Sequence, residues 1–113
     1  INNLAKSAYV KFLDKKLALN IQIKTDIYIE IFDKFIKLPK DDIGGVKIIE
    51  KEEILKDSKY IIYKTDPRLL KRLLKGPRYA HWNNAEIGSH IRFYRNPNIY
   101  ERNIFGSMCY LHN

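Results

Sequence analysis

The densest group of residues that could do chemistry lies between Tyr79 and His90. It combines two histidines, the only tryptophan, two amides and a carboxylate, namely His81, Trp82, Asn83, Asn84, Glu86 and His90. A histidine oriented by a carboxylate is a common general base, but no nucleophile motif accompanies this pair. Two interpretations remain open: a contact site for another domain or an acidic ligand, or a core tryptophan with turn-binding amides and a Glu86–arginine pair.

The spacing of the histidines and the single cysteine does not indicate a metal or cofactor site. His81 and His90 are nine residues apart, which matches no standard zinc pattern, and HExxH and CxxC motifs are absent. The only cysteine, Cys109, excludes an intramolecular disulfide, favours a reducing, cytoplasmic compartment and is expected to be a small buried apolar group. We therefore expect no catalytic residue, metal or cofactor in this chain itself.

The positive charge is concentrated in the last part of the 113-residue chain. The net charge is +8, of which residues 67–113, with six arginines, two lysines and two acids, carry +6. Arginine is suited to bidentate binding of phosphate or carboxylate, although a solvated basic surface is the simpler explanation. Arg92, Tyr94 and Arg95 interleave cations with an aromatic ring, as in single-strand binders. Alternation explains them more simply as an exposed strand face, so nucleic acid is a less favoured partner.

These residues must be positioned by a small set of helices and strands. Apolar residues three and four apart over 5–17 predict a helix capped by Asn2 or Asn3. Alternation over 21–32 predicts a strand, or two strands with a turn near Thr25. No apolar run approaches the ~20 residues of a membrane span, and no signal peptide is visible.

The middle of the chain alternates loops with short strands. Pro39 and a Gly-Gly pair predict a loop over 37–45, followed by a strand beginning at Val46. Residues 50–58 predict a short helix or an irregular connection. The β-branched and aromatic residues of 60–65 predict a strand.

Asp66 and Pro67 predict the start of a leucine-rich helix that ends at Gly76. A strand is expected over 87–94, and the spacing of Asn98 and Glu101 resembles a capping box. The inner face of the final helix is expected to hold Ile104, Phe105, Met108 and Leu111. The order predicts one α+β domain with a small antiparallel or mixed sheet covered by helices.

The runs His81–Ile91, Arg95–Pro97, Tyr100–Arg102 and Met108–His112 resemble the carboxy-terminal part of bacterial metallo-β-lactamase-fold metal-dependent hydrolases. Those proteins are similar to hydroxylases of nucleotide-linked sialic and muramic acids. The resemblance implies that residues 1–113 are a non-catalytic accessory domain at the carboxy end of a longer hydrolase. It also implies that zinc or iron belongs to a preceding catalytic domain, since no HxHxDH run occurs in this chain.

The implied partners are that amino-terminal catalytic domain, an anionic or nucleotide-linked substrate, and a second copy of the chain in a homo-oligomer. The candidate ligand or domain-interface residues are His81, Trp82, Asn83, Asn84, Glu86, His90, Arg92 and Arg95.

The strand and leucine helix of 61–76 also look like the sterol-carrier type of lipid module, a small sheet covered by helices. That resemblance implies a free-standing carrier for an apolar or amphiphilic ligand. The candidate residues for its tunnel wall, which serve equally well as ordinary core, are Leu69, Leu73, Phe93, Ile104 and Met108.

Overall fold

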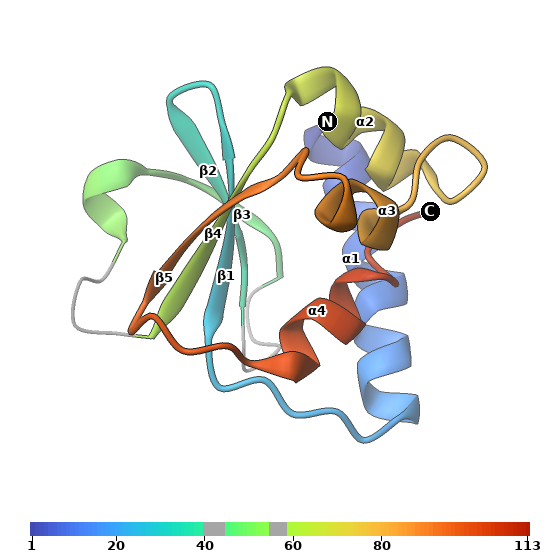
Figure 1. The fold of residues 1–113 in the computed structure, drawn as a ribbon, viewed down its shortest axis with the longest axis horizontal. Coiled ribbons are helices and arrows are strands. Elements are labelled where there is room, and N and C mark those ends of the chain that lie inside the picture. Colours follow the sequence, from blue (N-terminus) through green and yellow to red (C-terminus); the bar gives the residue numbers. More distant parts are fainter. Residues whose placement is uncertain (40–44, 55–58) are drawn as a thin grey trace.

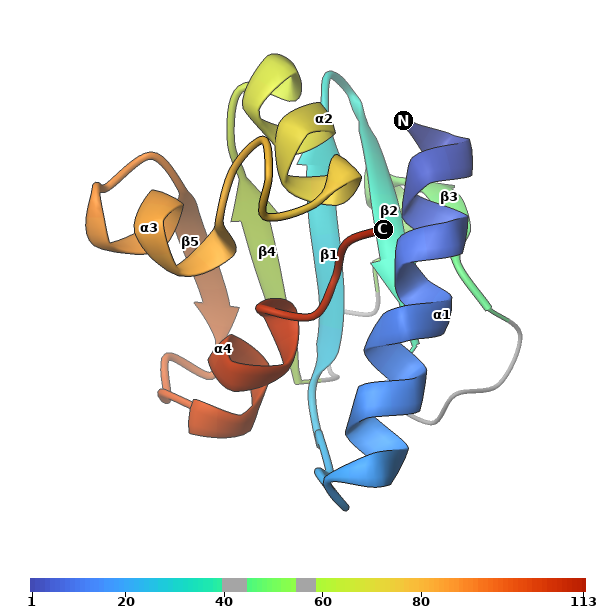
Figure 2. The same ribbon diagram turned by 90° about the vertical axis from the view of Figure 1, so that its right-hand side faces the viewer.

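The computed structural model describes residues 1–39, 45–54 and 59–113, and places a layer of helices on one face of a mixed sheet (Figure 1). The predicted α+β class, with a small mixed sheet covered by helices, is confirmed. Figure 2 looks onto the helical layer and shows the strands behind it.

The sheet has five strands in the order β3-β2-β1-β4-β5. Their bounds are β1 Asp26–Ile31, β2 Lys34–Leu38, β3 Lys47–Glu50, β4 Tyr60–Lys64 and β5 Arg92–Asn96. The central pair, β1 and β4, is parallel, and the remaining neighbours are antiparallel. The two outer strands, β3 and β5, are the edges of the sheet.

The helices are α1 Asn2–Ala18, α2 Pro67–Lys75, α3 Trp82–Ile87 and α4 Arg102–Met108, and a single 3-10 turn, η1, spans Lys51–Glu53. Helix α1 lies over the β2 side of the sheet, whereas α3 and α4 lie over the β5 side (Figure 2). Helix α2 begins as predicted, with Asp66 as its cap and Pro67 as its first residue, and Gly76 ends it.

The main core lies between the sheet and the helices. It is built from the strand residues that alternate toward the helices, such as Ile29, Ile36 and Tyr63, together with Leu70 and Leu73 of α2. A smaller cluster on the other face joins Tyr28 and Phe35 to Ile54. Each fully buried leucine or isoleucine contributes about 1.5–3 kcal/mol through the removal of apolar surface from water.

Three predicted details of the first half are wrong. The cap of α1 is Ile1, which makes no side-chain cap bond, rather than Asn2 or Asn3. The alternating stretch forms a strand only from Asp26, and the chain turns at Phe32 rather than near Thr25. The turn leads into β2, which occupies the first residues of the expected loop, because Phe35, Ile36 and Leu38 have apolar surface to bury.

The strand beginning near Val46 is confirmed as β3, and the strand over 60–65 is confirmed as β4. The expected connection over 50–58 contains η1, while its residues 55–58 lie outside the described part of the chain. The Gly-Gly pair of the expected loop includes Gly44, which also lies outside it.

The second half contains a helix that the sequence prediction missed. Residues 82–87 form α3, so the predicted strand over 87–94 begins only at Arg92. The capping box at Asn98 is also absent, because Glu101 is itself the residue before α4 and its carboxylate accepts a 2.7 Å hydrogen bond from the Thr25 hydroxyl. Cys109 is exposed rather than buried, with its thiol donating to the Phe105 carbonyl.

Within the described residues, no helix combines the length and the apolar character that crossing a membrane requires.

Candidate anion-binding site

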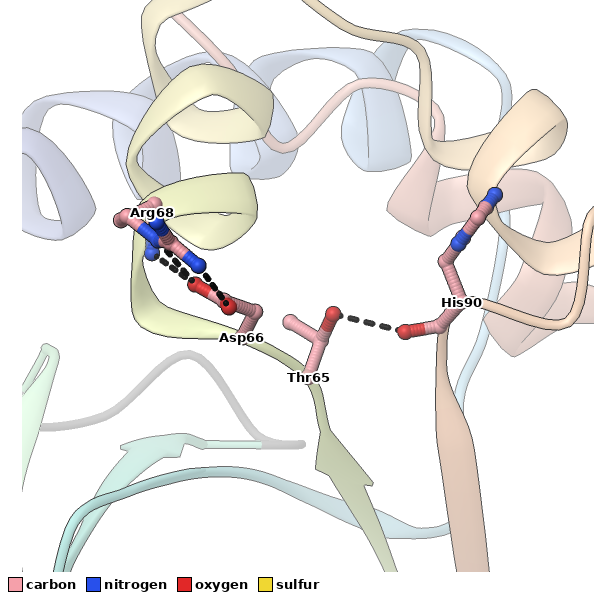
Figure 3. Close-up of polar contacts among 4 residues, drawn as sticks. All are labelled: Thr65, Asp66, Arg68 and His90. Carbon is pink, nitrogen blue, oxygen red and sulfur yellow. Dashed lines mark hydrogen bonds and ion pairs between the residues drawn. The ribbon is translucent and has the colours of Figure 1, made fainter.

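The candidate site lies where β4 passes into α2. His90, two residues before β5, lies beside it. Thr65 follows β4, and its hydroxyl donates a 2.8 Å hydrogen bond to the backbone carbonyl of His90 (Figure 3). This bond joins segments twenty-five residues apart in the sequence. It therefore ties the start of α2 to the backbone at His90.

Asp66 organises the start of α2. Its carboxylate accepts a 2.7 Å bond from the backbone N–H of Arg68 and two further bonds, at 3.3 and 3.1 Å, from the Arg68 guanidinium (Figure 3). The side-chain and backbone bonds from Arg68 lower the pKa of Asp66, so this carboxylate stays charged under mildly acidic conditions. Pro67 supports the cap because its fixed φ suits the first helical position.

An open pocket of about 540 Å³ lies between this helix start and the segment around His90. Its lining residues include Asp66, Arg68, Leu69, Arg72, Tyr79 and His90. At its rim the Lys75 ammonium lies 5.4 Å from the centre of the Tyr79 ring.

Among the described residues, Arg72 is the arginine of this pocket whose side chain has no partner. Whereas the Arg68 side chain is bonded to Asp66, no hydrogen bond or ion pair joins the Arg72 side chain to any residue within 1–39, 45–54 and 59–113. Two arginines and one aspartate leave the lining with a positive charge even when His90 is neutral. A free guanidinium can hold a carboxylate or phosphate through two parallel hydrogen bonds.

The sequence pattern could have identified the two arginines of this pocket. Arg68 and Arg72 are four residues apart on α2, a spacing that places them on the same face of a helix. Residues 79–90 were a stronger candidate in the sequence, because the histidines and the tryptophan gather there.

The structure separates the predicted contact residues. Of the eight, His90 alone is among the residues that line the pocket. Trp82 is buried, and its indole N–H donates a 2.8 Å bond to the Leu111 carbonyl, which confirms it as a core residue. Asn83 and Asn84 are exposed on α3, and His81 is exposed just before that helix.

Glu86 is partly buried, and this burial raises the pKa of its carboxyl group. No arginine pairs with it among the residues that the structure describes, so the expected Glu86–arginine pair is not formed.

Arg92 is exposed on β5, as predicted, but Arg95 is not on the same face. Arg95 is aligned with the core residue Ile61 and is partly buried, because residues 92 and 95 cannot share one face of a strand with a period of two. Its side chain lies near the end of β5, beside Pro97 and Tyr100.

The residues suggested for a lipid tunnel are part of the packed core. Leu73, Ile104 and Met108 are at most 2% exposed, and Leu69 and Phe93 pack against the same cluster. Phe93 lies against Tyr63 with a ring-centre distance of 4.9 Å.

The described residues contain no group of three or more histidine, cysteine, aspartate or glutamate side chains placed to hold a metal ion.

Comparison with known protein families, with curated proteins and with solved structures finds no match to this chain. The function is therefore inferred from the pocket and the surfaces around it.

Proposed function

We propose that this chain is a non-catalytic binding module whose pocket at the start of α2 holds an anionic group of a ligand or of a neighbouring domain. One observation carries the proposal: Arg72 lies without a partner among the described residues, in a pocket that also contains Arg68 and His90. An unpaired guanidinium in a preformed pocket can exchange water for a carboxylate or phosphate with little rearrangement.

The resemblance of residues 81–112 to the ends of metallo-β-lactamase-fold hydrolases supports a more specific setting. In it, the module packs on a metal-dependent catalytic domain and helps to bind that enzyme's anionic substrate. The zinc or iron and the chemistry then belong to the other domain. The carrier hypothesis has less support, because Leu73, Ile104 and Met108 fill the core instead of lining a tunnel.

The test is a titration of the ¹⁵N-labelled chain with inorganic phosphate and with citrate at constant ionic strength, followed by backbone amide shifts. We expect the amides of residues 65, 66, 68, 69 and 90–92 to move. Arg72→Gln weakens phosphate binding about tenfold or more, because a charge-assisted hydrogen bond contributes about 1.5–3 kcal/mol.

The matched control is Arg78→Gln, which removes an exposed arginine outside α2. Phosphate binding should be unchanged in this variant. Equal losses in both variants would show that phosphate responds only to total charge, and an absence of localised shifts would contradict the proposed site.

A further inference from the structure

Among the described residues, the face of the sheet opposite the helices is open toward β5, whereas Tyr28 and Phe35 on its β1–β2 side are buried against Ile54. Among the described residues only the segment around η1 lies over it, while all four α-helices lie on the other side (Figure 1). The side chains that alternate toward this face include Phe35, Tyr60, Ile62 and Tyr94. Tyr94 is 50% exposed.

A groove of about 370 Å³ runs over this face, between the η1 segment and the β5 edge. Its apolar floor is formed by Phe35, Tyr60 and Ile62, and Tyr94 lies at the β5 side. Tyr60 is aligned with Asn96, and Tyr94 with Ile62, so the two tyrosines are diagonal neighbours on adjacent strands. Their rings therefore offer two stacking surfaces within a short distance.

Cations border the groove. Its lining residues include Lys51, Glu30 and Arg95, although the register places Arg95 on the helix-facing side of the edge strand β5. Lys64 and Arg92, directly opposite each other in the register of β4 and β5, lie on the face of the groove. Lys64 is bonded to Glu30 at 2.8 Å, but Arg92 has no ion pair within the part of the chain that the structure describes. Glu30 therefore already neutralises Lys64, and Arg92 is the cation of this opposed pair that is left to bind an anion.

The same positive surface continues to the pocket of the proposed function. Arg92 on β5 follows His90 by two residues, and Lys64 precedes Thr65, which is bonded to the His90 carbonyl. From the groove around the end of β4 to the pocket, the basic residues are thus Arg92, Lys64, Arg68 and Arg72, of which Lys64 and Arg68 are paired with Glu30 and Asp66. A single small anion would occupy only one end of this surface, whereas a chain of phosphates would follow all of it.

We propose that the groove and the pocket together bind single-stranded nucleic acid, with bases stacked on Tyr94 and Tyr60 and with phosphates held by Arg92 and Arg72. The proposal rests on the proposed anion-binding function, and it names the ligand class. Aromatic rings on an open sheet with surrounding cations are the combination that recognises unpaired bases, because rings stack on any base while cations follow the backbone.

The experiment measures fluorescence anisotropy of a labelled ~12-nucleotide single strand, as oligo-dT and oligo-U, with the full chain at low and at moderate salt. Tyr94→Ala should weaken binding about tenfold, and Tyr94→Phe should retain it, because stacking needs the ring and not the hydroxyl. Arg92→Gln should weaken binding and reduce the dependence of log K on log salt by about 0.7, the effect of one lost phosphate contact.

Phe32→Ala is the matched aromatic control. Phe32 is 82% exposed, but it lies at the β1–β2 turn beside Asp33, Glu50 and Glu52. Its replacement should leave oligonucleotide binding unchanged. Fluorescence of the buried Trp82 verifies that each variant is folded.

Three outcomes would overturn the proposal: no binding of either oligonucleotide at low salt, equal binding of a duplex with no effect of Tyr94→Ala, or equal binding of a poly-glutamate peptide. The phosphate titration distinguishes failure of the nucleic-acid proposal from failure of the anion-binding pocket. If phosphate still shifts the amides of residues 65, 66, 68 and 69 while oligonucleotides do not bind, only the nucleic-acid proposal fails. If oligonucleotides bind without any effect of Arg72→Gln, and phosphate does not bind, the pocket of the proposed function fails and the groove alone is retained.

Discussion

Ile61 and Ile62 are neighbours in β4, yet they lie in two different environments. Ile61 faces the helices and is 1% exposed, whereas Ile62 faces the groove and is only partly buried. The same contrast separates Tyr63, which packs against Trp82 and Phe93, from Tyr94, which lies half in solvent. The covered face therefore holds most of the interactions that specify the fold, and the open face is the one that we propose to bind a ligand.

The largest expected effect is a loss of folding stability when Ile61 on the covered face is truncated, compared with Ile62 on the open face. Ile61→Ala should lower the free energy of unfolding by about 3 kcal/mol, because it leaves a cavity in the packed core. Ile62→Ala should cost about 1 kcal/mol, since solvent already reaches that side chain and can fill the space. Urea unfolding followed by Trp82 fluorescence measures both values. Similar losses for the two variants would mean that the open face is covered in solution.

Tyr63 and Tyr28, one buried on each face of the sheet, sharpen the comparison through pH. Burial raises the pKa of Tyr63 well above its ordinary value of 10.0, and it also raises the pKa of Tyr28 on the open face. A raised pKa in the folded state means that stability is fully present below pH ~10 and is lost as the pH rises further.

Tyr63→Phe should therefore retain more stability than the parent chain at pH ~10.5, and Tyr28→Phe should show a smaller gain. At pH ~7 both changes should be within about 1 kcal/mol of neutral, because neither buried hydroxyl has a hydrogen-bond partner among the residues that the structure describes. Urea unfolding midpoints at pH ~7 and pH ~10.5 measure both expected differences. A large loss at neutral pH in either variant would reveal a partner for that hydroxyl.

The smallest expected effect is the loss of stability when Asp66, which caps α2 beside the pocket, is removed. Hydrogen bonds from Arg68 lower the pKa of Asp66 from its ordinary 3.8, so the stability from this carboxylate is present above that pH and is lost as the pH falls through the lowered value. Asp66→Ala should reduce the melting temperature at neutral pH and match the parent chain at pH ~2. Asp14→Ala, which removes an exposed acid from α1, should change neither measurement. A difference that persists at pH ~2 would contradict this assignment.

The elements with strong local signals were predictable from sequence. Asp66, Pro67 and Gly76 define α2 because each satisfies a backbone requirement at a helix end, whatever surrounds it. The strand β4 was predictable because its β-branched and aromatic residues suit a pleated surface. The overall α+β class followed from such elements.

Elements that depend on distant partners were not predictable. The short helix α3 is held in place by the bond from Trp82 to Leu111, twenty-nine residues away. Glu101 failed as part of a capping box because Thr25, far from it in the sequence, takes its carboxylate.

The candidate site shows the same division. His90 was identified by its residue type, but its place in the pocket depends on the Thr65 bond across the sheet. Arg72 was noted only as one of six arginines, and its location in that pocket became visible only after folding.

The arginines of β5 have a second consequence, for self-association. An edge strand exposes backbone N–H and C=O groups that can pair with the edge of another molecule. In β5 this edge carries Arg92 and Arg95, and Pro97 follows it without an N–H to donate. Charge repulsion between two such edges opposes the growth of one sheet onto the next. The residues that we propose to attract phosphate therefore also protect the protein from polymerising through its own exposed strand.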